Sequence, residues 1–307
     1  MSLNNLGFVS NSSAGTGVGA KFDRFLRKIQ LTEAQTADAI SKHERIREAL
    51  NEHYYGKSLI SNTSQLIGSY GKRTAIRPPR DVDLLFVLPE SVRSKYTIFD
   101  SNIQSRILQE VKTVLQRRFP LTKMSADGPV IYIPFTESSF TVELVPAFRI
   151  YSGRFEVCYT KDGGSWGTTY PDEEANQLTA SNQKTNGNTI RLIKMMKKWQ
   201  YYCNVELDSF AIELLCQEFL QTYQYADKSS VYYDWMVRDF LKHILNKFFN
   251  SVSKPGFLLS ELDIGDEWKS KARSALQRVE KAISLEEKYP YLATEEWQKV
   301  FGSDFTG

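Results

Sequence analysis

The chain lacks the long apolar stretches and the strong charge imbalance that mark several large classes of protein. None of its segments approaches the 18 or more consecutive apolar residues of a membrane-spanning helix. Its first residues, Met-Ser-Leu-Asn-Asn-Leu, also lack the charged and apolar regions of a secretory signal. The net charge of +3 is too small to indicate nucleic-acid binding by itself. We therefore expect a cytoplasmic protein with no membrane attachment and no strong nucleic-acid signal.

Cysteine is also scarce. Cys158, Cys203 and Cys216 are odd in number and show no metal-binding spacing, which is typical of reduced thiols in the cytoplasm. Cys203 and Cys216 fall on apolar positions of expected helices, so we expect them to fill the core. The sequence contains no internal repeat, heptad run or low-complexity segment, which argues against repeat architectures.

The length and hydropathy of the chain predict a substantial core. With 307 residues, of which 41% are hydrophobic, it fits one large domain or two closely packed lobes. A stretch rich in Ser, Gly and Asn predicts a flexible N-terminal segment at residues 1–20. We assign residues 21–170 to a core with a mixed or antiparallel sheet and an N-terminal helix, and residues 171–307 to a helical lobe with a C-terminal tail. The expected fold class is α+β, with a cleft between the two lobes.

Local patterns predict the elements of both lobes. Thr32 and Gln35 match a capping box, which predicts a helix from Thr32 to Asn51. The other expected elements are a helix at 101–118, two strands at 130–135 and 140–145 that form a hairpin or meander, and helices from Pro171 onward. Trp199 recurs with other apolar residues at helical spacing, so we assign it to the core.

The most informative segment is Asp-Val-Asp-Leu-Leu-Phe-Val-Leu at residues 81–88. Alternate side chains of a strand face the same way, so Asp81 and Asp83 share a face with Cα atoms about 6.6 Å apart. Two carboxylates at one end of an apolar strand repel each other and lose hydration, and a bound cation relieves both costs. Mg²⁺ is expected because it takes carboxylates, water and substrate phosphates as ligands. A solvated Asp-x-Asp strand face is the alternative.

A small turn precedes these two acids. Gly68 and Ser69 offer free backbone N–H groups, and Lys72 adds a cation, which together suit an anion at a turn or helix start. Pro78 and Pro79 then keep the intervening segment in a loop. A phosphate cradle followed by metal ligands is the order that nucleotidyl transfer needs.

This order of motifs resembles the DNA polymerase β-type nucleotidyltransferase superfamily. Within it, the chain is most similar to the bacterial cGAS/DncV-like nucleotidyltransferases, which make cyclic di- and trinucleotide signals in anti-phage defence (CBASS). The similarity extends over nearly the whole chain, through the runs 68–74, 81–83, 143–147, 192–199, 208–213 and 297–302.

The resemblance implies a third acidic residue and contacts to the nucleotide. Glu143 matches the family position usually filled by Asp, so it is expected to join Asp81 and Asp83 as a catalytic and metal-binding residue. The extra methylene of Glu143 is a departure from the family pattern, and a strand Glu that faces solvent is the alternative. The nucleotide-binding residues that we expect are Gly68, Ser69, Thr74, Lys197 and Ser209.

The resemblance also implies an activity and its partners. ATP, GTP or other NTPs would be joined by phosphoryl transfer with release of pyrophosphate, helped by two Mg²⁺ ions or by Mn²⁺. Some members of the family are conjugated to other proteins through a C-terminal Gly by a ubiquitin-like apparatus, which makes Gly307 a candidate conjugation site. Related enzymes depend on a HORMA-type activator, and the sequence does not choose between the two. The bases, ring size, linkage, activating signal and oligomeric state stay open.

Two other interpretations stay open from the sequence. One is a polymerase β-like enzyme that modifies RNA ends or a small acceptor molecule such as an antibiotic. The other is a catalytically weak scaffold that senses nucleotides, an interpretation that the unusual Glu143 keeps alive.

Overall fold

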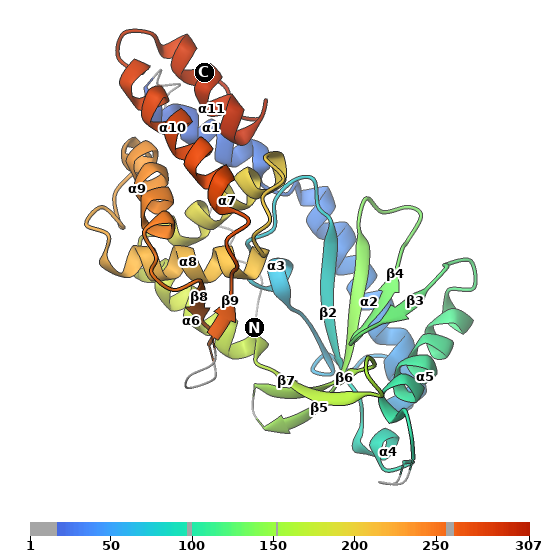
Figure 1. Cartoon of the computed structure of the whole chain (residues 1–307). Helices are drawn as coiled ribbons and strands as arrows, with labels where there is room; N and C mark the ends of the chain where they lie inside the picture. Colours follow the sequence, from blue (N-terminus) through green and yellow to red (C-terminus); the bar gives the residue numbers. More distant parts are fainter. Residues whose placement is uncertain (1–16, 97–99, 152, 256–260) are drawn as a thin grey trace.

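A computed structural model describes residues 17–96, 100–151, 153–255 and 261–307. A sheet lobe and a helical lobe lie side by side (Figure 1). This arrangement confirms the expected α+β fold. Residues 1–16 of the expected flexible segment lie outside the described residues, and its last residues belong to the first helix, α1 (Val18–Ile29).

The sheet lobe is built on a seven-stranded mixed sheet. Five strands follow the order β1-β2-β5-β4-β3, and β6 and β7 extend the sheet from β5. β2 and β5 are parallel, whereas the other neighbours are antiparallel. The strands are β1 (Ser64–Leu66), β2 (Asp81–Val87), β3 (Ser125–Asp127), β4 (Val130–Ile133), β5 (Thr141–Tyr151), β6 (Arg154–Tyr159) and β7 (Ser165–Thr169). The expected antiparallel pair is confirmed as β4 and β5, whereas β6 and β7 were not predicted.

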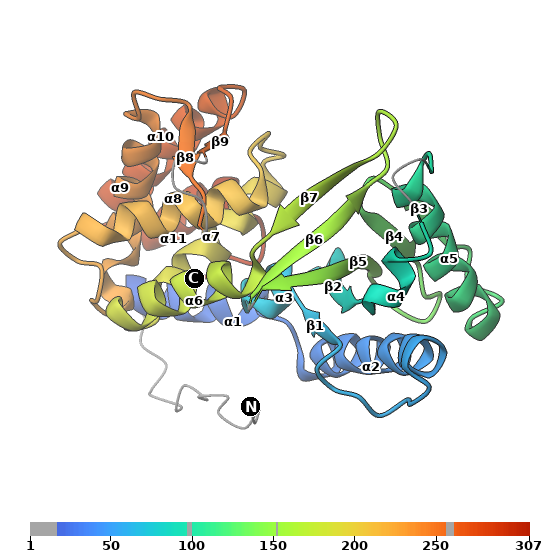
Figure 2. The ribbon, with the colours of Figure 1, turned by 90° about the horizontal axis from the view of Figure 1, so that it is seen from below.

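The side chains of β2 point alternately to two faces of the sheet, and one of these faces is packed in the core of the sheet lobe. Val82, Leu84 and Phe86 are fully buried and pack in one cluster with residues of α2 (Glu33–Tyr55) and α5 (Ile103–Arg118) (Figure 2). Because side chains alternate along a strand, this packing turns Asp81 and Asp83 to the opposite face. The core therefore fixes the face of the sheet on which both Asp side chains lie.

The capping box places the start of α2 as predicted. The N–H of Gln35 donates to Thr32 Oγ1 (3.1 Å), and the N–H of Thr32 donates to Gln35 Oε1 (3.0 Å). The helix continues past the expected end at Asn51 to Tyr55, where Gly56 adopts the left-handed conformation.

The helical lobe combines α1 with most of the chain beyond residue 170. Its other elements are α6 (Pro171–Lys184), α7 (Asn188–Tyr202), α8 (Ser209–Thr222), the short η1 (Ser230–Tyr232), α9 (Tyr233–Leu245), β8 (Ser251–Ser253), β9 (Glu261–Asp263), α10 (Lys269–Leu285) and α11 (Pro290–Phe301). The expectation of helices alone from Pro171 onward is wrong for β8 and β9, which form a two-stranded ribbon. Two further short helices, α3 (Gly68–Gly71) and α4 (Glu90–Arg93), belong to the sheet lobe.

The helical core joins both ends of the described chain. Phe22 and Phe25 of α1 pack on Phe305, with ring centroids 5.1 and 5.4 Å apart, and Phe305 also stacks on Trp297 at 5.5 Å. The side chain of Gln298 donates to the carbonyl of Phe305 (3.0 Å). α1 was not predicted as a helix, and most of its residues were assigned to the 21–170 core, but it packs with the C-terminal helices. The predicted N-terminal helix is α2, which packs with the sheet. The change of lobe near residue 170 coincides with the step from β7 to α6.

Other expectations about the core can be checked directly. Trp199 is fully buried in the helical core, as expected. Cys158 and Cys216 are buried, Cys203 is half-buried, and all three thiols are free. Among the described helices, none is both long and apolar enough to span a membrane.

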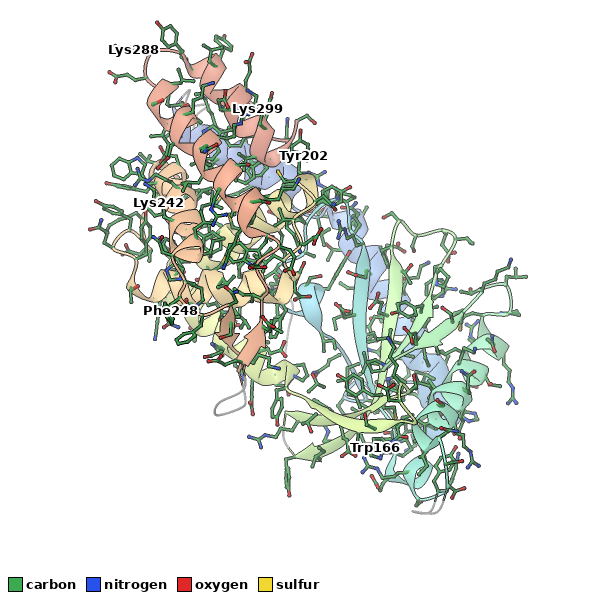
Figure 3. The ribbon with its side chains drawn as sticks, in the orientation of Figure 1. Trp166, Tyr202, Lys242, Phe248, Lys288 and Lys299 are labelled. Carbon is green, nitrogen blue, oxygen red and sulfur yellow. The ribbon has the colours of Figure 1, made fainter. Side chains whose placement is uncertain are left out.

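Replacing Phe305 by Ala tests whether the tail is anchored as the structure shows. We expect the variant to lose about 3–5 kcal/mol of unfolding free energy, because a fully buried ring leaves a cavity between two helices. Phe248, labelled in Figure 3, is 90% exposed, so Phe248→Ala should change stability by less than about 0.5 kcal/mol. Chemical denaturation of both variants measures the difference. Equal, small effects would show that the tail is not anchored in solution.

Candidate active site

The two Asp residues of β2 lie beside Glu143 on the neighbouring strand. In the parallel pairing of β2 and β5, Asp83 stands opposite Glu143 and Asp81 stands opposite Thr141. Residues paired in this way point to the same face of a sheet. All three carboxyl groups are half-buried. The sheet thus brings together the three acids that the sequence analysis named.

The Gly68-Ser69 turn packs directly against Asp83. The N–H of Ile67 donates to the carbonyl of Asp83 (3.0 Å), and the backbone N–H of Ser69 donates to its carboxylate. Gly68 has a φ of +55°, and a Cβ added there would overlap the Asp83 carboxylate. Glycine at this position is therefore required both by the backbone conformation and by the close approach of Asp83.

A cavity of about 370 Å³ opens in front of this turn, between the two lobes. One wall comes from the turn, from the loop that leads to β2, and from β2 itself, and the other comes from α7 and α8. The expected site residues that line it are Gly68, Ser69, Asp81, Asp83, Lys197 and Ser209. Glu143 and Thr74 do not line this cavity. The cleft predicted between the lobes therefore exists, and most of the expected site residues face it.

Thr74 instead lies behind the cavity in a buried polar network. Its hydroxyl donates to Glu213 Oε1 (2.6 Å) and accepts from Lys197 Nζ (3.0 Å). Lys197 Nζ also lies 2.6 Å from Glu213 Oε1, and Lys72 Nζ lies 2.7 Å from Glu213 Oε2. Lys72 makes a second ion pair with Glu174 (3.2 Å). Thr74 thus orders the wall of the site without facing the cavity.

Glu213 is the residue that sequence reasoning missed. It is 3% exposed, and burial opposes ionisation of its carboxyl group, but the ion pairs with Lys197 and Lys72 outweigh burial and lower its pKa. Burial also acts against the charge of Lys72, yet Glu213 and Glu174 raise the pKa of that amine. Glu213 therefore favours the charged form of Lys72 and forms an ion pair with Lys197 beside the cavity. The signal in the sequence was present but weak, since Glu213 lies one helical turn beyond Ser209 on α8.

Ser209 is positioned by the start of α8. Asp208 caps the helix by accepting hydrogen bonds from the N–H groups of Phe210 (2.7 Å) and Ala211 (3.3 Å). The Ser209 hydroxyl donates to Gln200 Oε1 (3.0 Å), and both residues line the cavity. A hydroxyl at the positive end of a helix suits an anionic ligand.

Arg80 and Tyr201, which lie on the two walls of the cavity, were also not predicted from the sequence. The guanidinium of Arg80 lies 4.7 Å from the ring centroid of Tyr201, and both side chains line the cavity. Arg80 immediately precedes Asp81, so the loop that ends at β2 carries a cation next to the acids. Its Tyr201 partner on α7 could not be identified by spacing along the chain.

Two of the acids, Asp83 and Glu143, have raised pKa values in the folded protein. Burial and the charge of Asp81 raise the pKa of Asp83 to about 6, although Lys72, Lys197 and the Ser69 N–H act in the opposite direction. Burial and the two Asp charges raise the pKa of Glu143 to about 7. Clustered carboxyl groups with raised pKa values fit a site that is completed by a cation.

The present geometry of these side chains is not that of a closed metal site. Among the residues that the structure describes, no three acidic, His or Cys side chains lie close enough together to hold a metal ion. The Asp83 carboxylate is directed at the Gly68-Ser69 turn, which accounts for part of this separation. The backbone register is suited to a shared cation, whereas the side-chain directions are not.

Comparison with known proteins supports this description of the fold. Residues 17–182 match the family described as the Second Messenger Oligonucleotide or Dinucleotide Synthetase domain (SMODS), which is more than half of the chain. A probable cyclic nucleotide synthase of Bacillus cereus (strain VD146) is 22% identical, over 92% of this chain and 96% of its own length.

Two groups of solved structures share the fold. The Vibrio cholerae DncV cyclic AMP-GMP synthase, solved with a linear intermediate, superimposes with a TM-score of 0.74 at 13% identity and covers 95% of this chain and 97% of its own. Escherichia coli MS115-1 CdnC, solved as a CdnC:HORMA-deltaN complex, has a TM-score of 0.68 at 18% identity and covers 94% of this chain and 98% of its own. Residues 197–213 lie beyond the family match, so their roles rest on the geometry described above.

The raised pKa values predict a pH-dependent stability in the absence of metal. Asp83 and Glu143 bind protons more tightly in the folded state than in the unfolded chain. Their contribution to the free energy of unfolding is therefore fully present below about pH 4 and is lost as the pH rises through about 7. Glu143→Gln should remove part of this fall, so its melting temperature in EDTA should exceed that of the wild type at pH 8 but not at pH 5. Exposed Glu52→Gln is the control, and a parallel pH profile for Glu143→Gln would contradict the assignment.

Proposed function

Because the chain belongs to the Second Messenger Oligonucleotide or Dinucleotide Synthetase family, we propose that its cleft joins nucleoside triphosphates into a cyclic di- or trinucleotide with release of pyrophosphate. The protein is a nucleotidyltransferase of the bacterial cGAS/DncV-like group. The observation that carries the proposal is the parallel pairing of β2 and β5, which sets Asp83 beside Glu143. Asp81 lies two positions before Asp83 on the same face, and Asp83 packs against the Gly68-Ser69 turn.

The acids provide the place for divalent metal. Asp81, Asp83 and Glu143 would hold two Mg²⁺ ions, or Mn²⁺, which supply charge neutralisation on the triphosphate and a more acidic attacking hydroxyl. The raised pKa values of Asp83 and Glu143 fit this role, because a cation would relieve the repulsion between the carboxylates. Asp83 must rotate away from the Gly68-Ser69 turn to share an ion with its neighbours. We infer that the incoming phosphates take over the N–H group of Ser69 that Asp83 now occupies.

The triphosphate would bind between the two walls of the cavity. The backbone of Gly68 and Ser69 would bind phosphate oxygens from one side, and Lys197 with Ser209 would bind them from the other. A ribose hydroxyl oxygen then forms a bond to the α-phosphorus as the bond to pyrophosphate breaks, and Glu143 positions that hydroxyl or accepts its proton. Positioning and charge neutralisation carry most of the acceleration in such a transfer.

The biological setting is proposed by likeness to relatives. We propose that the product is a signal in anti-phage defence (CBASS) and that ATP, GTP or other NTPs are its precursors. The CdnC:HORMA-deltaN complex makes a HORMA-type activator the favoured partner. Conjugation through Gly307 is less favoured, because this exposed residue lies only two positions beyond the buried Phe305 and the tail would have to detach to enter an enzyme.

One observation favours a second function. Glu143 does not line the cavity, which is expected of a scaffold that senses nucleotides with little turnover. Incubation with all four NTPs separates the possibilities, since a phosphatase-resistant cyclic product identifies the synthase. A requirement for added RNA or drug would identify another polymerase β-like enzyme, and thermal stabilisation by ATP and Mg²⁺ without product would identify the scaffold.

Replacing Asp81 and Asp83 by Asn tests the metal-binding assignment. The double variant should lose pyrophosphate release by more than about 100-fold, because neutral amides cannot neutralise bound metal. It should stay folded, with a melting temperature in EDTA at pH 8 no lower than that of the wild type, since a repulsive pair has been removed. Exposed Asp127→Asn is the control. A double variant that retains activity would refute the assignment.

Replacing Glu213 by Gln tests whether it positions the two lysines. Loss of the carboxylate removes the larger of the two charges that raise the pKa of Lys72. We therefore expect KM for NTP to rise about tenfold or more and the alkaline limit of binding to move to lower pH. Glu213→Asp should restore part of the effect, and Glu174→Gln, which removes only the second partner of Lys72, should have a smaller one. A Gln variant that loses stability without any shift of the pH limit would assign Glu213 a structural role alone.

A further inference from the structure

The basic residues of α7 have separate environments, and one of them has no use in the proposed reaction. Lys197 faces the catalytic cavity, and Lys198 pairs with Asp304 of the C-terminal tail. Arg191 donates to the carbonyl of Asn186 and to the side chain of Asn188. Lys194 makes no hydrogen bond or ion pair with any residue that the structure describes, although it is half-buried.

Lys194 lines a second hollow, of about 480 Å³, on the helical lobe. This hollow is formed by α1, the turn between α6 and α7, the first turns of α7, and η1. Its charged lining consists of Arg27, Arg191, Lys194, Lys228 and a single acid, Asp23. The catalytic cavity shares none of these residues. The hollow is thus separate from the site described above and strongly biased toward anions.

Arg191 is held in place by neutral groups. Its guanidinium donates to the carbonyl of Asn186 (2.8 Å) and to Asn188 Oδ1 (2.9 Å). It lies over Gly187, whose φ is +86° and where an added Cβ would come within 3.0 Å of the guanidinium. Because these partners carry no negative charge, the ordered cation keeps its attraction for an anion.

The other charges in the hollow do not neutralise this bias. Asp23 accepts a hydrogen bond from Ser230 (2.9 Å), and Lys228 pairs with Asp227 (3.3 Å) at the surface. Burial and the charge of Lys197 lower the pKa of Lys194 to about 8. The ammonium group of Lys194 therefore lacks a counter-charge that an anion in the hollow would provide.

From this arrangement we infer that the hollow beside Lys194 and Arg191 is a binding site for a compact polyanion that carries phosphate or carboxylate groups. Its volume of about 480 Å³ accommodates an oligophosphate or a tricarboxylate. The inference rests on residues that the catalytic proposal does not use.

The hollow also contacts the wall of the catalytic cavity. Arg27 and Gln30 line it, and the end of α1 that carries them is bonded to the loop before β2. The N–H of Arg77 donates to the carbonyl of Ile29 (2.8 Å), and Gln30 pairs with Ile76, which lines the catalytic cavity. The loop that precedes Asp81 therefore connects the hollow to the catalytic cavity.

Calorimetric titration with inorganic tripolyphosphate and, separately, citrate in EDTA tests the inference. For tripolyphosphate the wild type should bind at two sites, because the catalytic cavity also has cations. Lys197→Met should keep the site in the hollow, whereas Lys194→Met should lose it or weaken it by about tenfold or more. Lys194→Arg, which keeps the charge, should bind like the wild type. The comparison of the two probes shows whether phosphate or carboxylate is preferred.

The control separates local charge from net charge. Lys112→Met removes one positive charge from α5, which does not line the hollow, and should leave both sites unchanged. If Lys194→Met titrates like Lys112→Met with both probes, the hollow is not an anion site. Loss of turnover in Lys194→Met has no bearing on this test, and loss of the site in the hollow leaves the catalytic proposal intact.

Discussion

The buried carboxylate of Glu213 binds side chains of both lobes, and the arrangement of the cleft between the lobes depends on these contacts. Its oxygens bind Lys197 of the same lobe and Lys72 and Thr74 of the other, all within 2.7 Å. A buried charge without a partner costs several kcal/mol, so none of these side chains can be buried unless the others are present. Docking of the lobes and ordering of Lys72, Thr74 and Lys197 around Glu213 are therefore coupled. This explains why a hydroxyl that does not face the cavity, that of Thr74, belongs to the site.

Acidic and basic side chains lie close together in the cleft. Asp81 and Asp83 line it from the start of β2, Lys72 lines it from the same lobe, and Lys197 lines it from α7. In the proposed reaction, a metal would be needed between the triphosphate and the acids but not between the triphosphate and the lysines. Asp83 would then have to change its position, because its carboxylate now accepts the Ser69 N–H that a phosphate would use.

The sequence predicted what local periodicity determines and missed what only the fold brings together. Asp81 and Asp83 share a face because β2 alternates with buried Val82 and Leu84, a pattern that is visible in the sequence. Glu213 was not assigned, because its lysine partners are 16 and 141 positions away. β7 was missed since its Ser-Trp-Gly-Thr-Thr run has no apolar alternation and depends on pairing with β6. The place of α1 was missed because Phe22 packs against Phe305, at the other end of the chain.

Residues of α7 line both the catalytic cavity and the hollow beside Lys194, and the core holds this helix in one orientation. Leu192, Met195, Met196 and Trp199 are fully buried, so the helix cannot rotate about its axis without opening the core. Lys194 and Lys197 are three positions apart on one helix and so lie close together on its surface, where the charge of Lys197 lowers the pKa of Lys194. An anion bound at either lysine reduces the repulsion that the other experiences. Since coupling between two sites is reciprocal, a triphosphate in the cleft and a polyanion in the second hollow would each favour the charged state of the lysine that the other contacts.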